Sequence, residues 1–117
     1  MKTQSFKDVL VWRKAHSLVL SVYELTKSFP REELFGLTSQ MRRSSVSVAA
    51  NIAEGYRKKT KPDKARFYNS AQGSLDETIY YFILSHDLGY ANTNILQQQA
   101  DEVAKLLYGY IRGLETN

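Results

Sequence analysis

The stretch Gly36–Lys59, GLTSQMRRSSVSVAANIAEGYRKK, joins a weakly polar helix pattern to the start of the most basic part of the chain. Residues on one face recur at helical spacing, and small or apolar residues fill an adjoining face: Leu37, Met41, Ser45, Val48 and Ile52, then Val46, Ala49, Ala50 and Ala53. Small side chains between Ser44 and Ala53 let neighbouring helix backbones approach closely. We therefore expect a central helix over about residues 38–54.

The ends of this helix are predicted from capping chemistry. The hydroxyl of Thr38 or Ser39 is suited to accept a hydrogen bond from the first free amides, and Gly55 suits a left-handed residue that ends a helix. The basic run would then begin directly after the helix.

Three further helices are predicted, over about residues 9–29, 61–88 and 94–114. Asp8 is a candidate cap for the first helix and Pro30 its stop, while Thr60 and Gly89 would bound the third. Each helix has an apolar seam with alternating spacings of three and four: Val11, Ala15, Leu18, Val22, Leu25 and Phe29; Tyr68, Ala71, Leu75, Thr78, Phe82 and Ser85; Leu96, Ala100, Val103, Leu107, Tyr110 and Leu114.

Four seams with short connections predict an all-α protein, an antiparallel up-down-up-down four-helix bundle. At 117 residues we expect a single domain over residues 1–117. Gly73, inside the third helix, suggests a close helix crossing at that point.

Composition excludes several classes of protein. The chain has no cysteine, which rules out disulfides and thiol chemistry. It has no apolar run of membrane-spanning length and no signal-peptide pattern at its start, so we expect a soluble, cytoplasmic protein. Neither His16 nor His86 follows a glutamate by three residues, as in di-metal bundles, and no hydrolytic triad or glycine-rich phosphate loop is recognisable. We therefore predict no enzyme activity, no cofactor and no metal.

Positive charge is concentrated in one segment. The net charge is +4, but residues 42–66 carry eight basic residues against Glu54 and Asp63, a net +6, and the remainder sums to −2. Such an excess attracts nucleic acid, an acidic partner or an anionic membrane, although a solvated charged loop has the same composition. The candidate phosphate contacts are Arg42, Arg43, Arg57, Lys58, Lys59, Lys61, Lys64 and Arg66.

Several other residues have two interpretations. Leu34 and Phe35 are expected to anchor a loop on the core, with contact to a partner as the alternative. Asn51 and Glu54 are expected to form interhelical hydrogen bonds, with Glu54 paired to an arginine such as Arg57, rather than to contact a partner or RNA. Aromatic residues next to the basic segment are candidates for stacking on bases, although the last two are expected in the core or an interface: Tyr56, Phe67 and Tyr68.

Short motifs along nearly the whole chain resemble a family of small bacterial four-helix-bundle proteins, the 23S rRNA intervening-sequence proteins. The most specific is Asn51-Ile52-Ala53-Glu54-Gly55. The others are Phe6-Lys7-Asp8 with Trp12, Phe29-Pro30, Phe35-Gly36-Leu37, Gln40 with Arg42-Arg43, Gly73-Ser74-Leu75 with Glu77, and Leu88-Gly89-Tyr90. The chain departs from many relatives at Ala49, where they carry proline, and at Tyr80-Tyr81-Phe82. The first departure suggests a straighter second helix, and the second a different surface around those aromatic residues.

The resemblance implies a homo-oligomer, a ring or barrel of five identical subunits. Some relatives are encoded within insertions in ribosomal RNA genes, and a related group serves diversity-generating retroelements, where a basic ring is thought to engage RNA and a reverse transcriptase. A reverse transcriptase or another protein is thus one implied partner.

Two functions from different classes follow. The first is a non-enzymatic homo-oligomer that binds nucleic acid, preferably RNA, through the basic segment. The second is a protein-interaction scaffold whose basic segment docks an acidic partner or a neighbouring subunit. Residues 67–117 carry six acids against Lys105 and Arg112, a net −4, which gives the second function a candidate acidic surface.

Overall fold

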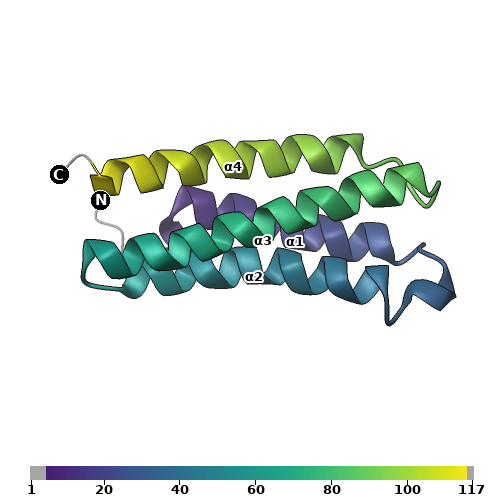
Figure 1. Ribbon diagram of the computed structural model, residues 1–117, viewed down its shortest axis with the longest axis horizontal. Coiled ribbons are helices and arrows are strands. Elements are labelled where there is room, and N and C mark those ends of the chain that lie inside the picture. Colours follow the sequence, from purple (N-terminus) through teal and green to yellow (C-terminus); the bar gives the residue numbers. More distant parts are fainter. Residues whose placement is uncertain (1–4, 116–117) are drawn as a thin grey trace.

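The computed structural model describes residues 5–115 as four helices that run in alternating directions (Figure 1). These are α1 (Leu10–Thr26), α2 (Leu37–Arg57), α3 (Lys61–Asp87) and α4 (Asn94–Glu115), and two short 3₁₀ helices, η1 (Phe6–Asp8) and η2 (Arg31–Glu33), precede α1 and α2. The prediction of an all-α, antiparallel up-down-up-down four-helix bundle is confirmed. The bundle is elongated, about 47 × 23 × 23 Å.

The core follows the predicted seams. Every seam residue of α3 is buried, from Tyr68 to Ser85, and in α2 Met41 and Val48 are fully buried. The seams are less complete at the ends of the bundle, where Leu25 is half-buried and Tyr110 is 37% exposed. Heptad spacing therefore identified the buried face of each helix, because a side chain's direction in a straight helix follows from its position alone.

Small residues hold α2 and α3 close together. The hydroxyls of Ser44 and Thr78 lie 2.7 Å apart, and those of Ser47 and Ser74 lie 2.8 Å apart. Both pairs are hydrogen-bonded between the helices, and Ser44 and Thr78 are buried. A third contact, between Gly55 and the ring of Tyr68, continues the same antiparallel order. The predicted close approach of small residues is therefore made along most of α2.

The prediction that Gly55 ends α2 is wrong, as is the predicted close crossing at Gly73. Helix α2 continues to Arg57, and Gly55 is buried inside it against the ring of Tyr68. A Cβ at this position would lie only 2.6 Å from Cε1 of Tyr68. The lack of a side chain, rather than a left-handed backbone, is what this position requires. Nothing lies within 4 Å of a Cβ built at Gly73.

Helix α1 begins at Leu10, one residue after the predicted boundary, but the predicted cap Asp8 and the predicted end at Phe29 are wrong. Asp8 lies in η1, which Ser5 caps, and Val9 is the N-cap residue of α1. At the other end, the amides of residues 27–29 bond to carbonyls three residues earlier, so the chain tightens into turns after Thr26. Pro30 follows these turns with extended backbone angles.

The cap of α2 comes from outside the helix instead of from Thr38 or Ser39, which both lie within it. The Leu37 amide donates to Oε1 of Glu33 over 3.1 Å, and Tyr90 donates from its hydroxyl to Oε2 over 2.8 Å. These two hydrogen bonds hold the pKa of the Glu33 carboxyl below its ordinary value. One carboxylate therefore joins the α1–α2 connection to the α3–α4 connection.

The caps predicted for α3 are confirmed. The Thr60 side chain accepts from the Asp63 amide, and Gly89 has a φ of 78° after the last turn. The Tyr90 amide then bonds to the Ser85 carbonyl, which completes the C-terminal capping pattern. Helix α3 ends one residue before the predicted boundary, and α4 runs one residue past it.

The two polar residues of the central helix, Asn51 and Glu54, bond within their own helix, so the predicted interhelical hydrogen bonds are wrong. Asn51 donates from Nδ2 to the carbonyl and the hydroxyl of Ser47, which in turn meets Ser74 of α3. Glu54 pairs with Lys58 at 3.8 Å, so the prediction of a partner such as Arg57 is wrong. Four residues separate Glu54 and Lys58, which places their side chains on the same face of the helix.

None of the described helices has the length and apolar content that crossing a membrane requires.

Replacing Gly55 by alanine is expected to destabilise the protein. The clash with the buried Tyr68 ring costs about 1–3 kcal/mol, which exceeds the helix propensity that alanine adds. The control Gly73→Ala adds a methyl group to open space and should stabilise α3 by about 0.5–1 kcal/mol. Urea unfolding monitored by circular dichroism measures both, and equal midpoints for the two variants would contradict this account of Gly55.

Replacing Glu33 by glutamine is expected to lower the urea midpoint at neutral pH. The folded pKa of Glu33 is depressed, so its contribution is complete above the ordinary glutamate pKa and is lost as the pH falls through the lowered value. The difference between Glu33→Gln and the unmodified protein should therefore shrink in acid. Glu32→Gln, one residue earlier on η2, is the control, and an unchanged difference between pH 7 and pH 3 would exclude this role of the carboxylate.

Candidate nucleic-acid interface

The eight predicted phosphate contacts separate into two groups. Arg42 and Arg43 lie in the first half of α2, and Arg57 is about 21 Å further along the same helix at 1.5 Å per residue. The other group surrounds the α2–α3 turn and is called here the end cluster: Arg57, Lys58, Lys59, Lys61, Lys64 and Arg66. The basic residues, which form one continuous segment in the sequence, therefore lie on two separate surfaces of the folded protein.

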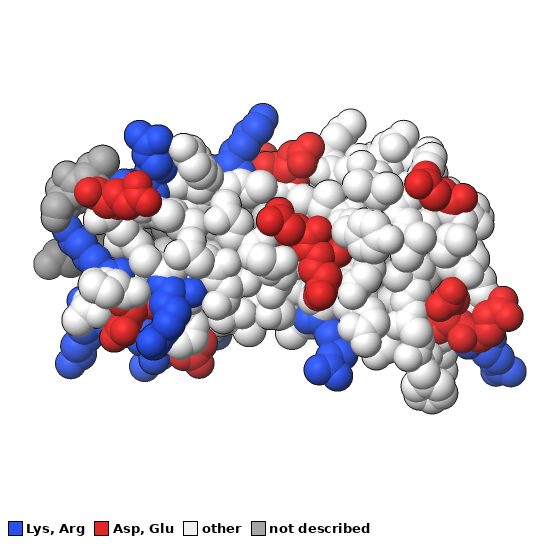
Figure 2. All heavy atoms as spheres, viewed as in Figure 1, with Lys and Arg blue, Asp and Glu red and all other residues white. Residues whose placement is uncertain are grey.

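The end cluster gathers because two helix ends and a short turn meet there. Helix α2 ends at Arg57, Lys58 is extended, and Thr60 caps α3 two residues later. Six cations and only two acids, Glu54 and Asp63, occupy residues 54–66, a net +4. Most of the Lys and Arg side chains on the visible face accordingly gather at this end of the molecule, whereas Asp and Glu side chains are spread along its whole length (Figure 2).

Lys64 has a structural role within this cluster. Its Nζ donates to the carbonyls of Gly55 and Tyr56 over 3.2 and 2.7 Å. These carbonyls belong to the last turn of α2, where the Gly55 carbonyl also accepts from the Lys58 amide over 3.2 Å. Partial burial lowers the pKa of the Lys64 ammonium, which is the direction that desolvation gives a cation. Two of its three N–H bonds are therefore engaged in the fold.

Two other members of the cluster have acidic neighbours. Lys58 lies 3.8 Å from Glu54, and Arg66 lies 3.5 Å from Asp63. Both cations also lie against the ring of Phe67, at 4.9 and 5.3 Å from its centroid. These ion pairs are largely exposed, and such pairs are worth at most about 1 kcal/mol, so an incoming phosphate competes with them easily.

Arg57 and Lys59 are the exposed members of the cluster without an ion pair or hydrogen bond to the described residues. Arg57 borders a cavity of about 520 Å³ together with Ser5, Phe6, Tyr56 and Lys64. Tyr56 is half-buried there, whereas Tyr68 is buried in the core, as predicted. Cations and aromatic rings therefore lie side by side at this end of the bundle.

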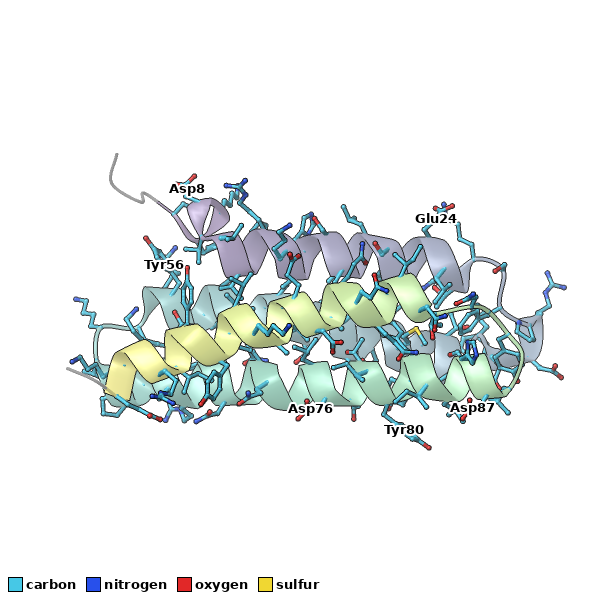
Figure 3. All side chains as sticks on the ribbon, turned by 90° about the horizontal axis from the view of Figure 1, so that it is seen from above. Asp8, Glu24, Tyr56, Asp76, Tyr80 and Asp87 are labelled. Atoms are coloured by element: carbon cyan, nitrogen blue, oxygen red, sulfur yellow. The ribbon has the colours of Figure 1, made fainter. Side chains whose placement is uncertain are left out.

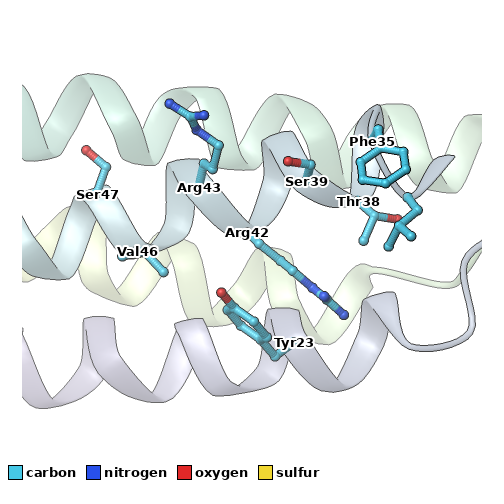
Figure 4. A pocket seen from close by; sticks show the side chains of 9 residues that line it. Tyr23, Phe35, Thr38, Ser39, Arg42, Arg43, Val46 and Ser47 are labelled. Carbon is cyan, nitrogen blue, oxygen red and sulfur yellow. The ribbon is translucent and has the colours of Figure 1, made fainter.

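The second group of cations borders a groove between α1 and the start of α2 (Figure 4). Arg42 is held in place, because its Nε donates to Oγ1 of Thr26 over 2.8 Å and its guanidinium lies 4.6 Å from the ring centroid of Tyr23. Arg43 is exposed and makes no ion pair or hydrogen bond within residues 5–115.

The prediction that Leu34 and Phe35 anchor a loop on the core is wrong. Leu34 is 47% exposed and Phe35 is 91% exposed. Both residues line the groove, which has a volume of about 580 Å³. Glu33 directs this connection, because its hydrogen bonds to Leu37 and Tyr90 hold the backbone before α2. Sequence alone did not indicate the exposure, since an apolar pair in a short loop usually points inward.

The two histidines lie on different helices and have different surroundings. The imidazole of His16 stacks on Trp12, with ring centroids 5.0 Å apart and an interplanar angle of 5°, and His86 is exposed in the last turn of α3. Within residues 5–115 no three histidine, aspartate or glutamate side chains come together as metal ligands would.

Replacing Lys64 by methionine is expected to destabilise the fold. The change removes two hydrogen bonds from a cation to the end of α2, at a cost of about 1–3 kcal/mol. The control Lys59→Met removes the same charge from the neighbouring turn and should be neutral within about 0.5 kcal/mol. Urea unfolding measures both, and equal losses of stability would contradict the assigned role of Lys64.

Comparison with known proteins places the chain in a family. The profile of the 23S rRNA-intervening sequence protein family matches residues 7–109. A protein of unknown function from the S23 ribosomal protein family of Bacteroides thetaiotaomicron has a crystal structure with a TM-score of 0.82 and 26% identity, covering 91% of this chain and 98% of that one. No curated protein matches. The chain therefore belongs to the family of 23S rRNA-intervening sequence proteins.

Proposed function

We propose that this protein is a non-enzymatic homo-oligomer that binds nucleic acid, with RNA preferred, through the end cluster. The observation that carries the proposal is the concentration of six cations around the α2–α3 turn, with Arg57 and Lys59 exposed and without an ion pair to the described residues. The family description, which refers to an intervening sequence of 23S rRNA, supports RNA over DNA.

The mechanism is electrostatic. Arg57 and Lys59 would contact phosphates first, and Lys58 and Arg66 would exchange their exposed acidic neighbours for phosphate oxygens. Neutralising phosphates releases counterions, so binding should weaken steeply as salt rises. Repetition of the cluster in a homo-oligomer would multiply the contacts made by one RNA molecule.

The basic residues differ in how freely they can contact a phosphate. Arg42 is fixed against Tyr23 and Thr26, and Lys64 caps α2. We therefore assign the main phosphate contacts to the exposed part of the end cluster and exclude Arg42 and Lys64 from them. Arg43 remains exposed, but it lies in the first half of α2 at the apolar groove.

The double substitution Arg57→Glu and Lys59→Glu is expected to weaken RNA binding by at least about tenfold. It should also lower the slope of log affinity against log salt by about one for each lost contact. The matched control, Arg31→Glu with Lys105→Glu, reverses two exposed cations elsewhere and should retain most of the affinity. Fluorescence anisotropy with a labelled single-stranded RNA at 50 and 200 mM salt measures all three proteins.

Two results would refute this function. If the unmodified protein binds RNA equally at both salt concentrations, or does not bind it, the electrostatic mechanism is wrong. If the double substitution breaks the oligomer and the control does not, the end cluster docks a neighbouring subunit, as the scaffold hypothesis requires.

A further inference from the structure

The groove between α1 and α2 exposes apolar surface that the fold does not need. Phe35 is 91% exposed at one end of the groove, and Val46 and Tyr23 are 42% and 41% exposed along it (Figure 4). A phenyl ring in water contributes nothing to folding stability, and contiguous exposed apolar residues mark interaction surfaces. The groove follows α2 from Thr38 to Ser47, about 14 Å at 1.5 Å per residue.

This groove is positively charged. The guanidinium of Arg42 is held over Tyr23, and Arg43 next to it has no acidic partner within residues 5–115. A partner that fills this groove should therefore have apolar side chains in its middle, to cover the exposed apolar residues, and acidic side chains at its ends, to pair with the arginines.

A surface with those properties lies on α3 of the same chain. Asp76, Tyr80, Ile83 and Asp87, called here the α3 stripe, are spaced by four, three and four residues and therefore share one face of the helix. Tyr80 is 57% exposed and Ile83 is 44% exposed. Figure 3 shows Asp76, Tyr80 and Asp87 along one edge of the bundle, directed away from the other helices.

The α3 stripe complements the groove in charge and length. Asp76 and Asp87 make no ion pair within the described part of the chain, and they flank the two apolar residues. The stripe is about 16 Å long at 1.5 Å per residue, close to the length of the groove. Both surfaces thus lack partners in the single chain and carry opposite charge.

We propose that the α3 stripe of one copy docks in the α1–α2 groove of a second copy, with Tyr80 and Ile83 against Phe35 and Val46 and an aspartate beside Arg43. This inference rests on the self-association in the proposed function and names the surfaces that produce it. The groove and the stripe are different surfaces of one chain, so the association is head-to-tail. An open chain of copies leaves one free groove at one end and one free stripe at the other, until the chain closes into a ring.

Single substitutions test the apolar part of this interface. Phe35→Ser and Tyr80→Ser should each raise the dissociation constant between copies by about tenfold or more, because each removes an aromatic anchor. Ile95→Ser is the control, since Ile95 is 69% exposed on α4 and lies outside both surfaces. Size exclusion coupled to light scattering over a range of protein concentrations gives the masses, and circular dichroism verifies that each variant keeps its helices.

Charge reversal tests the pairing itself. Arg43→Glu in one protein, and Asp76→Lys with Asp87→Lys in another, should each reduce the mass toward the 13.4 kDa of one chain. An equimolar mixture of the two should associate again, because each groove then meets a stripe of opposite charge. The two variants can pair only in alternation, so the mixture need not reach the original mass, but a mass above that of either variant alone is a result that general destabilisation cannot produce.

The outcomes separate this inference from the proposed function. If the unmodified protein associates and these substitutions leave its mass unchanged, the groove and the stripe are not the interface, although self-association stands. If the unmodified protein has the mass of one chain at every concentration, self-association and this inference both fail. RNA binding is read separately, since the end cluster shares no residue with either surface.

Discussion

The close contact between α2 and α3 is the constraint on which the rest of the molecule depends. Ser44 meets Thr78, Ser47 meets Ser74, and Gly55 receives the ring of Tyr68 in strict antiparallel order. Hydroxyl pairs this short require backbones that approach closely, and they satisfy polar groups that burial would otherwise penalise. With two helices fixed in this way, their connecting turn is short, and six cations are confined to one end of the bundle.

Periodicity predicted the fold and most helix boundaries to within one residue, but the ends of α1 and α2 were each misplaced by three residues. The seams of α1 and α3 were visible because burial in a helix depends on spacing along the chain alone. The end of α2 was not visible in the sequence. A glycine near the end of a helix usually caps it, but Gly55 is needed for the space that the ring of Tyr68, thirteen residues later, occupies. The cap of α2 was missed for a similar reason, since Glu33 reaches the helix from a separate 3₁₀ turn.

The candidate site was predicted from the positions of its charged residues alone, but in the structure these residues have different contacts. A count of lysines and arginines treats Lys64 and Lys59 alike, but one bonds the carbonyls of α2 and the other is exposed. Because the basic residues are close in sequence, they also suggested a single surface. In the structure, however, Arg43 and Arg57 lie far apart along α2. The exposure of Phe35 was not predictable, because it depends on the direction that Glu33 gives to the connection.

Photocrosslinking of the protein to a short RNA, followed by mass spectrometry of the crosslinked peptides, tests the central claim most directly. The account predicts crosslinks concentrated in residues 56–66, with Tyr56 next to Arg57 as the main aromatic site. It predicts far fewer crosslinks in the groove around Phe35, which a second copy should cover. Crosslinks concentrated in that groove, or spread evenly over the surface, would contradict the assignment of the end cluster to nucleic acid.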